Sequence, residues 1–240
     1  MSSSTGAALV APADPRGETV RELQERIRGM QRRTLDTRAL PTDPALAELL
    51  PGGALAAGTA VAVESSTLLA LGLLLGPSRA GSWCAVVGLP DLGVEAAAGL
   101  GIDLERLVLV PHPGEQWLSV LAALVEVVSV VLVRPPAPSR PGRPPVSEAA
   151  AGRLASRLRQ REAALVALGD WPRSEARLSI AESSWSGIGQ GFGRLQARQV
   201  TVASASRAWS GRGRSRRLWL PGADQRIAPV TAWDAAPAAG

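Results

Sequence analysis

Short apolar segments alternate with longer segments of helical character through the middle of the chain, and this alternation predicts an α/β fold. The short segments are apolar at nearly every position, as expected for a mainly parallel sheet that helices cover on both faces. Parallel neighbours need crossover connections, which the intervening helices supply. The expected strands are Thr59–Glu64, Trp83–Val87, Leu107–Val110, Val127–Val133 and Ala163–Leu168, and the expected helices are Thr67–Leu75, Val94–Leu100, Glu115–Glu126 and one that Ser147 caps.

The pattern changes after residue 168, where apolar and polar residues alternate and predict C-terminal antiparallel strands. The glycine-rich segment Ser186–Gly193 lacks the spacing and the strand-to-helix context of a dinucleotide-binding loop, so we interpret it as a hairpin connection. Arg207–Arg217 is the second expected connection. The alternating apolar pairs are Leu178 with Ile180, Leu195 with Ala197, Val200 with Val202, and Leu218 with Leu220.

Residues 1–45 are expected to form an N-terminal helix and a proline-containing linker, residues 46–222 the core domain, and residues 223–240 a disordered tail. Within Glu18–Arg33, apolar residues recur at spacings of three and four, which predicts an amphipathic helix surrounded by arginines. Two interpretations stay open: the helix packs on its own domain with a solvated basic face, or it docks onto a neighbouring subunit or partner. Its apolar stripe consists of Val20, Leu23, Ile27 and Met30.

Charge and composition leave the type of partner open. The chain has 240 residues, 46% of them hydrophobic, which fits one globular domain with a tail. Its 26 basic residues are all arginine and outnumber the 21 acidic residues. The net charge of +5 permits contact with nucleic acid or with an acidic partner. The absence of tyrosine and asparagine, however, is typical of high-GC coding, which enriches arginine without any role in binding.

Histidine and cysteine each occur once, and this limits the available chemistry. His112 has no second histidine with which to build a metal cluster, and Cys84 cannot form an internal disulfide, so we expect no metal site. The N-terminus lacks the features of a signal peptide, and Glu64 interrupts the most apolar span. These observations predict a cytoplasmic protein without a membrane segment.

The segment Glu64–Thr67 lies between the first central strand and its helix, where a phosphate-binding loop would stand. Such a loop needs glycines so that backbone N–H groups can surround the phosphates, a lysine for the β- and γ-phosphates, and a Ser or Thr for the metal. Ser66 and Thr67 are present, but the loop of Glu64, Ser65, Ser66 and Thr67 contains no glycine and the chain contains no lysine. We therefore predict that no nucleotide cofactor is bound.

The order of these parts resembles the nucleotide-binding core of the RecA family. More closely, the chain resembles the actinobacterial ImuA-type proteins over Leu46–Gly222. The motifs that carry this resemblance are Leu50-Pro51-Gly52-Gly53, Arg177-Leu178-Ser179-Ile180, Trp185-Ser186-Gly187, Gly193-Arg194-Leu195 and Arg217-Leu218-Trp219-Leu220-Pro221-Gly222.

The resemblance to RecA implies two acidic positions that this chain has lost. The family's Mg²⁺-organising aspartate corresponds to Arg134, and its water-activating glutamate corresponds to Pro90. Two like charges about 4 Å apart repel by roughly 4 kcal/mol at an effective dielectric constant near 20, so Arg134 opposes a metal ion there. Asp91 stays as an alternative base. We predict a degenerate nucleotide site without catalytic residues, in a protein that is not an enzyme.

The resemblance to ImuA-type proteins implies an accessory role in damage-induced mutagenic translesion synthesis during the SOS response. The implied partners are an ImuB-like, polymerase-related protein and an error-prone C-family DNA polymerase. Two alternatives stay open: a regulator that binds RecA or single-stranded DNA, and a divergent ATPase. Assembly with further copies of the chain also stays open.

Arginines and tryptophans alternate near the C-terminal end of the core. Basic charge next to aromatic surface is typical of sites for single-stranded nucleic acid, and it equally suits an acidic protein partner or a solvated connection. The proline-rich segment Pro135–Pro145, with Arg134, Arg140 and Arg143, is a weaker candidate for DNA contact. The main candidate residues are Arg207, Trp209, Arg212, Arg214, Arg216, Arg217 and Trp219.

Overall fold

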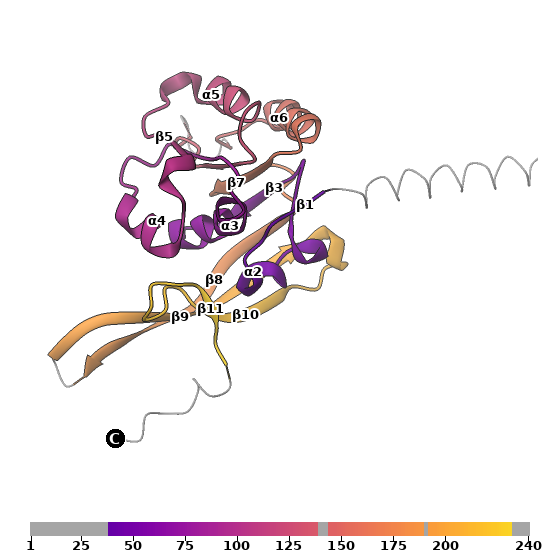
Figure 1. Ribbon diagram of the computed structural model, residues 1–240. Helices are drawn as coiled ribbons and strands as arrows, with labels where there is room; N and C mark the ends of the chain where they lie inside the picture. The colour runs from indigo at the N-terminus through magenta and orange to yellow at the C-terminus, as the bar shows by residue number, and fades with distance from the viewer. Residues whose placement is uncertain (1–37, 139–143, 190–191, 232–240) are drawn as a thin grey trace, which may run out of the picture. The chain divides into compact units, whose positions relative to one another are not determined.

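The computed structural model describes residues 38–138, 144–189 and 192–231, which contain a nine-stranded sheet in the order β11-β10-β9-β8-β3-β7-β6-β4-β5 (Figure 1). The five strands that the apolar segments predict form its parallel block, as expected. The strand β8 also runs parallel to β3, and the remaining three strands are antiparallel. Their bounds are β3 Ala60–Val63, β4 Cys84–Val87, β5 Leu107–Val110, β6 Val130–Val133, β7 Ala164–Leu168, β8 Ala176–Gly189, β9 Phe192–Ser206, β10 Arg214–Trp219 and β11 Ala228–Pro229.

Helices cover both faces of the parallel block, as Figure 1 shows. The helices α3 (Thr67–Arg79) and α4 (Val94–Leu100) pack on one face, and α5 (Trp117–Leu124) and α6 (Glu148–Arg161) pack on the other. Ser147 caps α6 as predicted, because its side chain accepts a hydrogen bond from the Ala150 amide at 3.2 Å. The short 3₁₀ turns η1 Pro51–Gly53, η2 Leu104–Arg106, η3 Gly114–Gln116 and η4 Arg207–Trp209 lie in the connections.

Several predicted elements have different bounds in the structure, and α3, for example, continues past the expected end at Leu75 to Arg79. The helix expected over Glu115–Glu126 divides into η3 and α5. The strand expected over Val127–Val133 begins only at Val130, because the Val127 and Val128 amides both bond to the Leu124 carbonyl and complete the turn after α5. Val127 is accordingly exposed. Apolar character alone therefore does not place the start of this strand.

The side chains of the central strands alternate between two apolar cores. Val61 and Val63 face α3 and α4, whereas Ala60 and Ala62 face α5 and α6. Burial also explains the lone cysteine, since it raises the pKa of the Cys84 thiol to about 12. A thiol with so high a pKa stays protonated at neutral pH and is an inert core residue.

The core begins before the boundary that composition suggests, so the linker prediction is wrong from residue 38 onward. The segment contains the strand pair β1 (Ala39–Leu40) and β2 (Leu55–Ala56) and the short helix α2 (Pro44–Ala47). Asp43 is buried, caps α2 through the Ala45 amide and pairs with Arg79 at 2.9 Å. Prolines suggested a linker, but Pro44 occupies the first turn of α2, where the missing N–H costs nothing.

The C-terminal end is also ordered further than expected. Residues 223–240 were expected to form a disordered tail, yet Ile227 is buried against the α3 face and β11 pairs with β10. Two parts of the chain named above, the expected helix Glu18–Arg33 and the segment 232–240, lie outside the described residues, as do Arg140 and Arg143.

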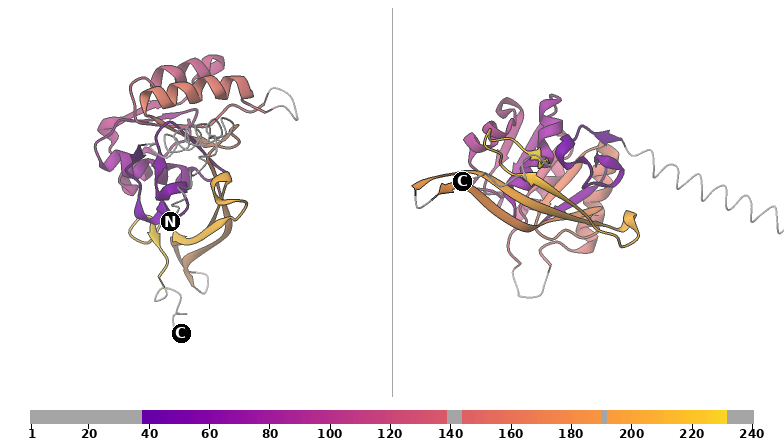
Figure 2. Two further views of the ribbon diagram at one scale, coloured as in Figure 1. Left: turned by 90° about the vertical axis from the view of Figure 1, so that its right-hand side faces the viewer. Right: turned by 90° about the horizontal axis from the view of Figure 1, so that it is seen from below.

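Two antiparallel connections differ from the expected loops. The strands β8 and β9 stay paired as far as Gly189 and Phe192, so the hairpin occupies most of Ser186–Gly193, and Figure 2 shows it extending past the helices. Arg207–Arg217 is a connection only as far as Gly213, because β10 starts at Arg214. The arginines suggested a loop, but they belong to a strand. Their long aliphatic stems can pack along the sheet, and the next residue that faces inward is Leu218.

Among the described helices, none is long and apolar enough to span a membrane. In the same part of the chain, no group of three or more His, Cys, Asp or Glu side chains is placed to hold a metal ion.

Candidate functional site

The segment between β3 and α3 is a tight cap, not an open loop. Only Glu64, Ser65 and Ser66 separate the two elements. Ser65 has a left-handed backbone with φ of 50°, and the Ser66 side chain accepts a hydrogen bond from the Leu69 amide at 3.2 Å. The cap therefore uses one of the N–H groups that a phosphate would otherwise receive, and three residues are too few to wrap around a triphosphate.

The side chain of Arg134 lies against the start of α3. It follows β6, and its Nη2 donates a hydrogen bond to Thr67 Oγ1 at 3.2 Å. Gly88, at the end of β4, lets the two strand ends approach, since a Cβ there would lie 2.6 Å from the Arg134 carbonyl oxygen. Pro90 and Asp91 are both exposed beyond this contact. The hydroxyl that a functional loop would offer to the metal is thus hydrogen-bonded to a guanidinium.

A second arginine closes the other side of the cap. Arg177 of β8 donates from Nη1 to Glu64 Oε1 at 3.2 Å and to Asp170 Oδ1 at 2.5 Å. The hydrogen bond to Asp170 is the largest cause of the raised pKa of Arg177, and Glu64 adds to it. Sequence reasoning missed Arg177 and Asp170 because 113 positions separate Arg177 from Glu64, and only the pairing of β8 with β3 brings them together.

The arginines and tryptophans predicted as one surface divide into separate groups. Arg214 and Arg216 lie on the inward face of β10, where Arg214 stacks on Trp209 at 4.4 Å and Arg216 pairs with Glu48 at 2.6 Å. Arg217 and Trp219 lie on the opposite face of the same strand, because neighbouring strand residues alternate. These side chains therefore do not form one stacking surface for bases.

Arg207 and Arg212 instead border a hollow of about 690 Å³, which we call the arginine cleft. In the part of the chain that the structure describes, neither side chain has an ion pair. Glu175 also lines the cleft, and burial raises its pKa, although a side-chain hydrogen bond with Thr59 partly offsets the shift. The cleft is lined by Trp171, Pro172, Arg173, Ser174, Glu175, Arg177, Ala205, Ser206, Arg207, Gly211, Arg212 and Gly213.

The connection Gly169–Glu175 positions one wall of this cleft. Trp171 is buried and packs edge-to-face against Trp117 of α5, with ring centroids 6.5 Å apart. Arg173 pairs with Glu148 at the start of α6, at 2.7 Å. These two contacts hold the connection Gly169–Glu175 in place as one wall of the arginine cleft. Arg207 and Arg212, in the connection between β9 and β10, border the other side.

Comparison with known proteins supports a RecA-like fold. The crystal structure of a KaiC-like protein, PH0186 from Pyrococcus horikoshii, is similar with a TM-score of 0.53 and 13% identity, over 81% of this chain and 100% of that one. At this identity the likeness concerns the fold alone.

Sequence comparison identifies a relative and a family. The uncharacterized protein Rv3395c of Mycobacterium tuberculosis is 32% identical over 135 residues, which are 55% of this chain and 63% of that protein. The match thus spans less than two thirds of the relative's length. The sequence model of the MT3502 N-terminal domain matches residues 48–173, more than half of the chain, and the protein belongs to that family.

Proposed function

We propose that this protein is a non-catalytic accessory protein of damage-induced mutagenic translesion DNA synthesis. In this role it is an adaptor for an ImuB-like, polymerase-related protein and for an error-prone C-family polymerase. The resemblance of its motifs to ImuA-type proteins supports the pathway. The observation that carries the non-catalytic part is the contact of Arg134 with Thr67 at the start of α3.

The side chains in and beside the segment between β3 and α3 oppose the binding of a triphosphate. Thr67 Oγ1, the hydroxyl that would bind a metal ion, already accepts a hydrogen bond from the positively charged Arg134. Glu64 adds a negative charge to the segment between β3 and α3, and Arg177 pairs with it at 3.2 Å. Each lost charge-assisted hydrogen bond is worth about 1.5–3 kcal/mol, so the combined losses remove useful affinity.

Calorimetry with ATP and Mg²⁺ tests the first half of the proposal. We expect a dissociation constant weaker than about 100 μM, which corresponds to less than roughly 5.5 kcal/mol of binding free energy. Tighter binding would favour the divergent ATPase. In that case Asp91→Ala should abolish hydrolysis, because Asp91 is the carboxylate next to the lost base position.

Purification from cells that carry the three genes tests the adaptor half. The full-length protein should co-purify with the ImuB-like protein, and deletion of its gene should lower damage-induced mutation. Thr67→Val keeps the side-chain shape but removes the hydroxyl, so an adaptor should retain full mutagenesis with it while an ATPase should not. Loss of mutagenesis in a stably folded Thr67→Val protein would contradict the proposal.

A second candidate, binding of single-stranded DNA, is favoured by the unpaired Arg207 and Arg212 of the arginine cleft. Anisotropy of a labelled oligonucleotide should then show an affinity that falls with salt, with a log–log slope of about −0.7 per neutralised phosphate. Arg207→Gln with Arg212→Gln should reduce that slope by about 1 to 2. A slope that stays unchanged in this folded variant would exclude the cleft as the DNA site.

A further inference from the structure

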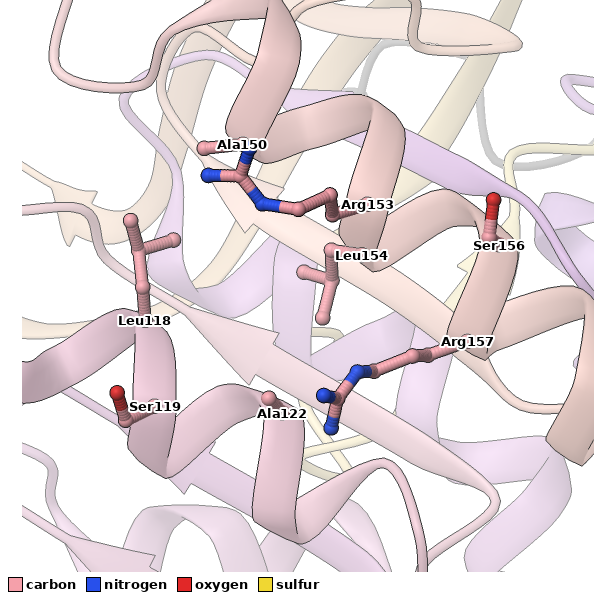
Figure 3. A pocket seen from close by; sticks show the side chains of 8 residues that line it. All are labelled: Leu118, Ser119, Ala122, Ala150, Arg153, Leu154, Ser156 and Arg157. Atoms are coloured by element: carbon pink, nitrogen blue, oxygen red, sulfur yellow. The ribbon is translucent and has the colours of Figure 1, made fainter.

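The helices α5 and α6 enclose an apolar groove on the face opposite α3. Its volume is about 470 Å³, and its floor is formed by Leu118 and Ala122 of α5 and by Leu154 of α6 (Figure 3). Small side chains help to create the space, because Ser119, Ala122 and Ala150 line it beside the two leucines. We call this hollow the α5–α6 groove.

Two arginines border the groove along α6. Figure 3 shows the side chains of Arg153 and Arg157 extending from α6 toward α5, over the space between the helices. They lie four residues apart, which is about 6 Å along the helix axis. Both are exposed, so their charges stand above an apolar floor that is open to a ligand.

Among the described residues, an acidic side chain pairs with Arg157 but none pairs with Arg153. Arg157 lies 3.8 Å from Glu126, but Glu126 makes a closer pair with Arg161 at the far end of the helix. The groove thus combines apolar surface with cations that have little internal compensation.

We propose that the α5–α6 groove docks a short acidic helix of a protein partner. The partner would place leucine-like side chains on the floor and two carboxylates beside Arg153 and Arg157. An amphipathic helix in an apolar groove presents its anchors at spacings of three and four. The spacing of the arginines therefore calls for acidic residues four positions apart. This proposal deepens the adaptor role and rests on it.

Charge complementarity argues against the two occupants that this chain could itself supply. The sequence Glu18–Arg33 carries five arginines and three glutamates, so its net charge has the same sign as the border of the groove. A second copy in a two-fold contact would bring Arg153 and Arg157 close to the same arginines. A partner segment rich in Asp or Glu meets neither repulsion.

The test uses the full-length protein and a fluorescein-labelled peptide of about four helical turns. The peptide carries leucines at spacings of three and four, and glutamates four positions apart beside them. A control peptide has the same composition with the leucines distributed around the helix. We expect saturable anisotropy for the first peptide, with a dissociation constant below about 100 μM, and at least about tenfold weaker binding for the control. No saturable binding of the first peptide up to about 1 mM would overturn the proposal.

Matched variants place the binding on the groove. Arg153→Glu with Arg157→Glu should weaken binding at least about tenfold, whereas Arg159→Glu, on the same helix but outside the lining, should stay within about twofold. Ser119→Trp should fill the groove and abolish binding, whereas Ala123→Trp, on an exposed position of α5, should not. If the reversed pair fails to fold, the Arg153→Gln and Arg157→Gln pair is measured instead. Equal losses in target and control variants would overturn the proposal.

The outcome is separable from the adaptor proposal. Co-purification of the ImuB-like protein with the Ser119→Trp variant should fall if the groove is its docking site. If peptide binding depends on the groove while the wild-type protein captures no ImuB-like protein, the adaptor role fails and the groove stands as a peptide site. If the wild-type protein captures its partner and the groove variants do so equally, the groove proposal fails alone.

Discussion

The segment between β3 and α3, which we call the closed site, and the border of the α5–α6 groove use the same type of side chain in opposite ways. Arg134 and Arg177 donate hydrogen bonds within the fold, and the acceptors are Thr67, Glu64 and Asp170. Arg153, in contrast, has no ion pair with any residue that the structure describes. The difference teaches that the number of arginines says little about binding, whereas the partners that each arginine already has decide whether its charge is available.

The largest expected effect on stability concerns the backbone at the closed site, and it tests whether Arg134 is held in place there. Gly88→Ala places an L-residue at φ of 75° and a Cβ 2.6 Å from the Arg134 carbonyl oxygen. We expect the free energy of unfolding to fall by about 2–4 kcal/mol, measured by urea denaturation. The control Gly99→Ala lies inside α4 with nothing within 4 Å, and it should be neutral or up to about 1 kcal/mol more stable. Similar effects of the two changes would show that Arg134 is not tightly held.

A smaller effect separates paired from unpaired arginines on neighbouring positions. Arg216 pairs with Glu48 at 2.6 Å. Arg216→Glu would place two carboxylates next to each other, so it should lower the free energy of unfolding by about 1 kcal/mol. Arg212→Glu, on the turn that borders the arginine cleft, should change it by less than about 0.5 kcal/mol. Thermal unfolding at low salt would reveal the difference. If Arg212→Glu destabilised the protein as much as Arg216→Glu, Arg212 would have a structural role.

The smallest effect concerns the acid in the arginine cleft and depends on pH. Burial raises the pKa of Glu175 above its ordinary value of 4.5, so the folded protein disfavours the charged form. The wild type therefore loses stability as pH rises from 4.5 through the raised pKa. Glu175→Gln should be more stable at pH 7 by about 0.5 kcal/mol. At pH values below 4.5 the two proteins should unfold at the same temperature.

That pH series has an outcome that would count against the assignment. If the difference between Glu175→Gln and wild type were the same on both sides of pH 4.5, the gain would not come from the titration of Glu175.

The central strands and helices were accessible from the sequence because their patterns are local. Val94–Leu100 and Leu107–Val110 have the predicted bounds, since each stands between clear turn signals. The start of the core was not accessible, because Pro41 and Pro44 imitate a linker. Only packing shows the difference: a Cβ on Gly76 of α3 would lie 2.3 Å from the Pro41 carbonyl oxygen, so this proline-containing segment rests directly on the helix.

The candidate site divides in the same way. The missing lysine and the absence of glycine from Glu64–Thr67 are visible in the sequence, and so is the arginine at position 134. The contact of Arg134 with Thr67, which spans 67 positions, is not. The distribution of the candidate residues from Arg207 to Trp219 over two faces is not visible either, because β10 starts at Arg214 and alternation along a strand sends neighbouring side chains to opposite faces.

The sequence by itself therefore determined the α/β class, the parallel block and the absence of lysine and glycine from Glu64–Thr67, because each depends on residue type and on spacing within one segment. Only the tertiary structure decided which arginines are neutralised and which remain available. Ion pairs such as Arg177 with Glu64 join elements that are distant along the chain, and the α5–α6 groove exists because two helices with small facing residues lie on the same side of the sheet. Neither the ion pairs nor the groove leaves a periodic signal in the sequence, because both depend on which strands are neighbours in the sheet.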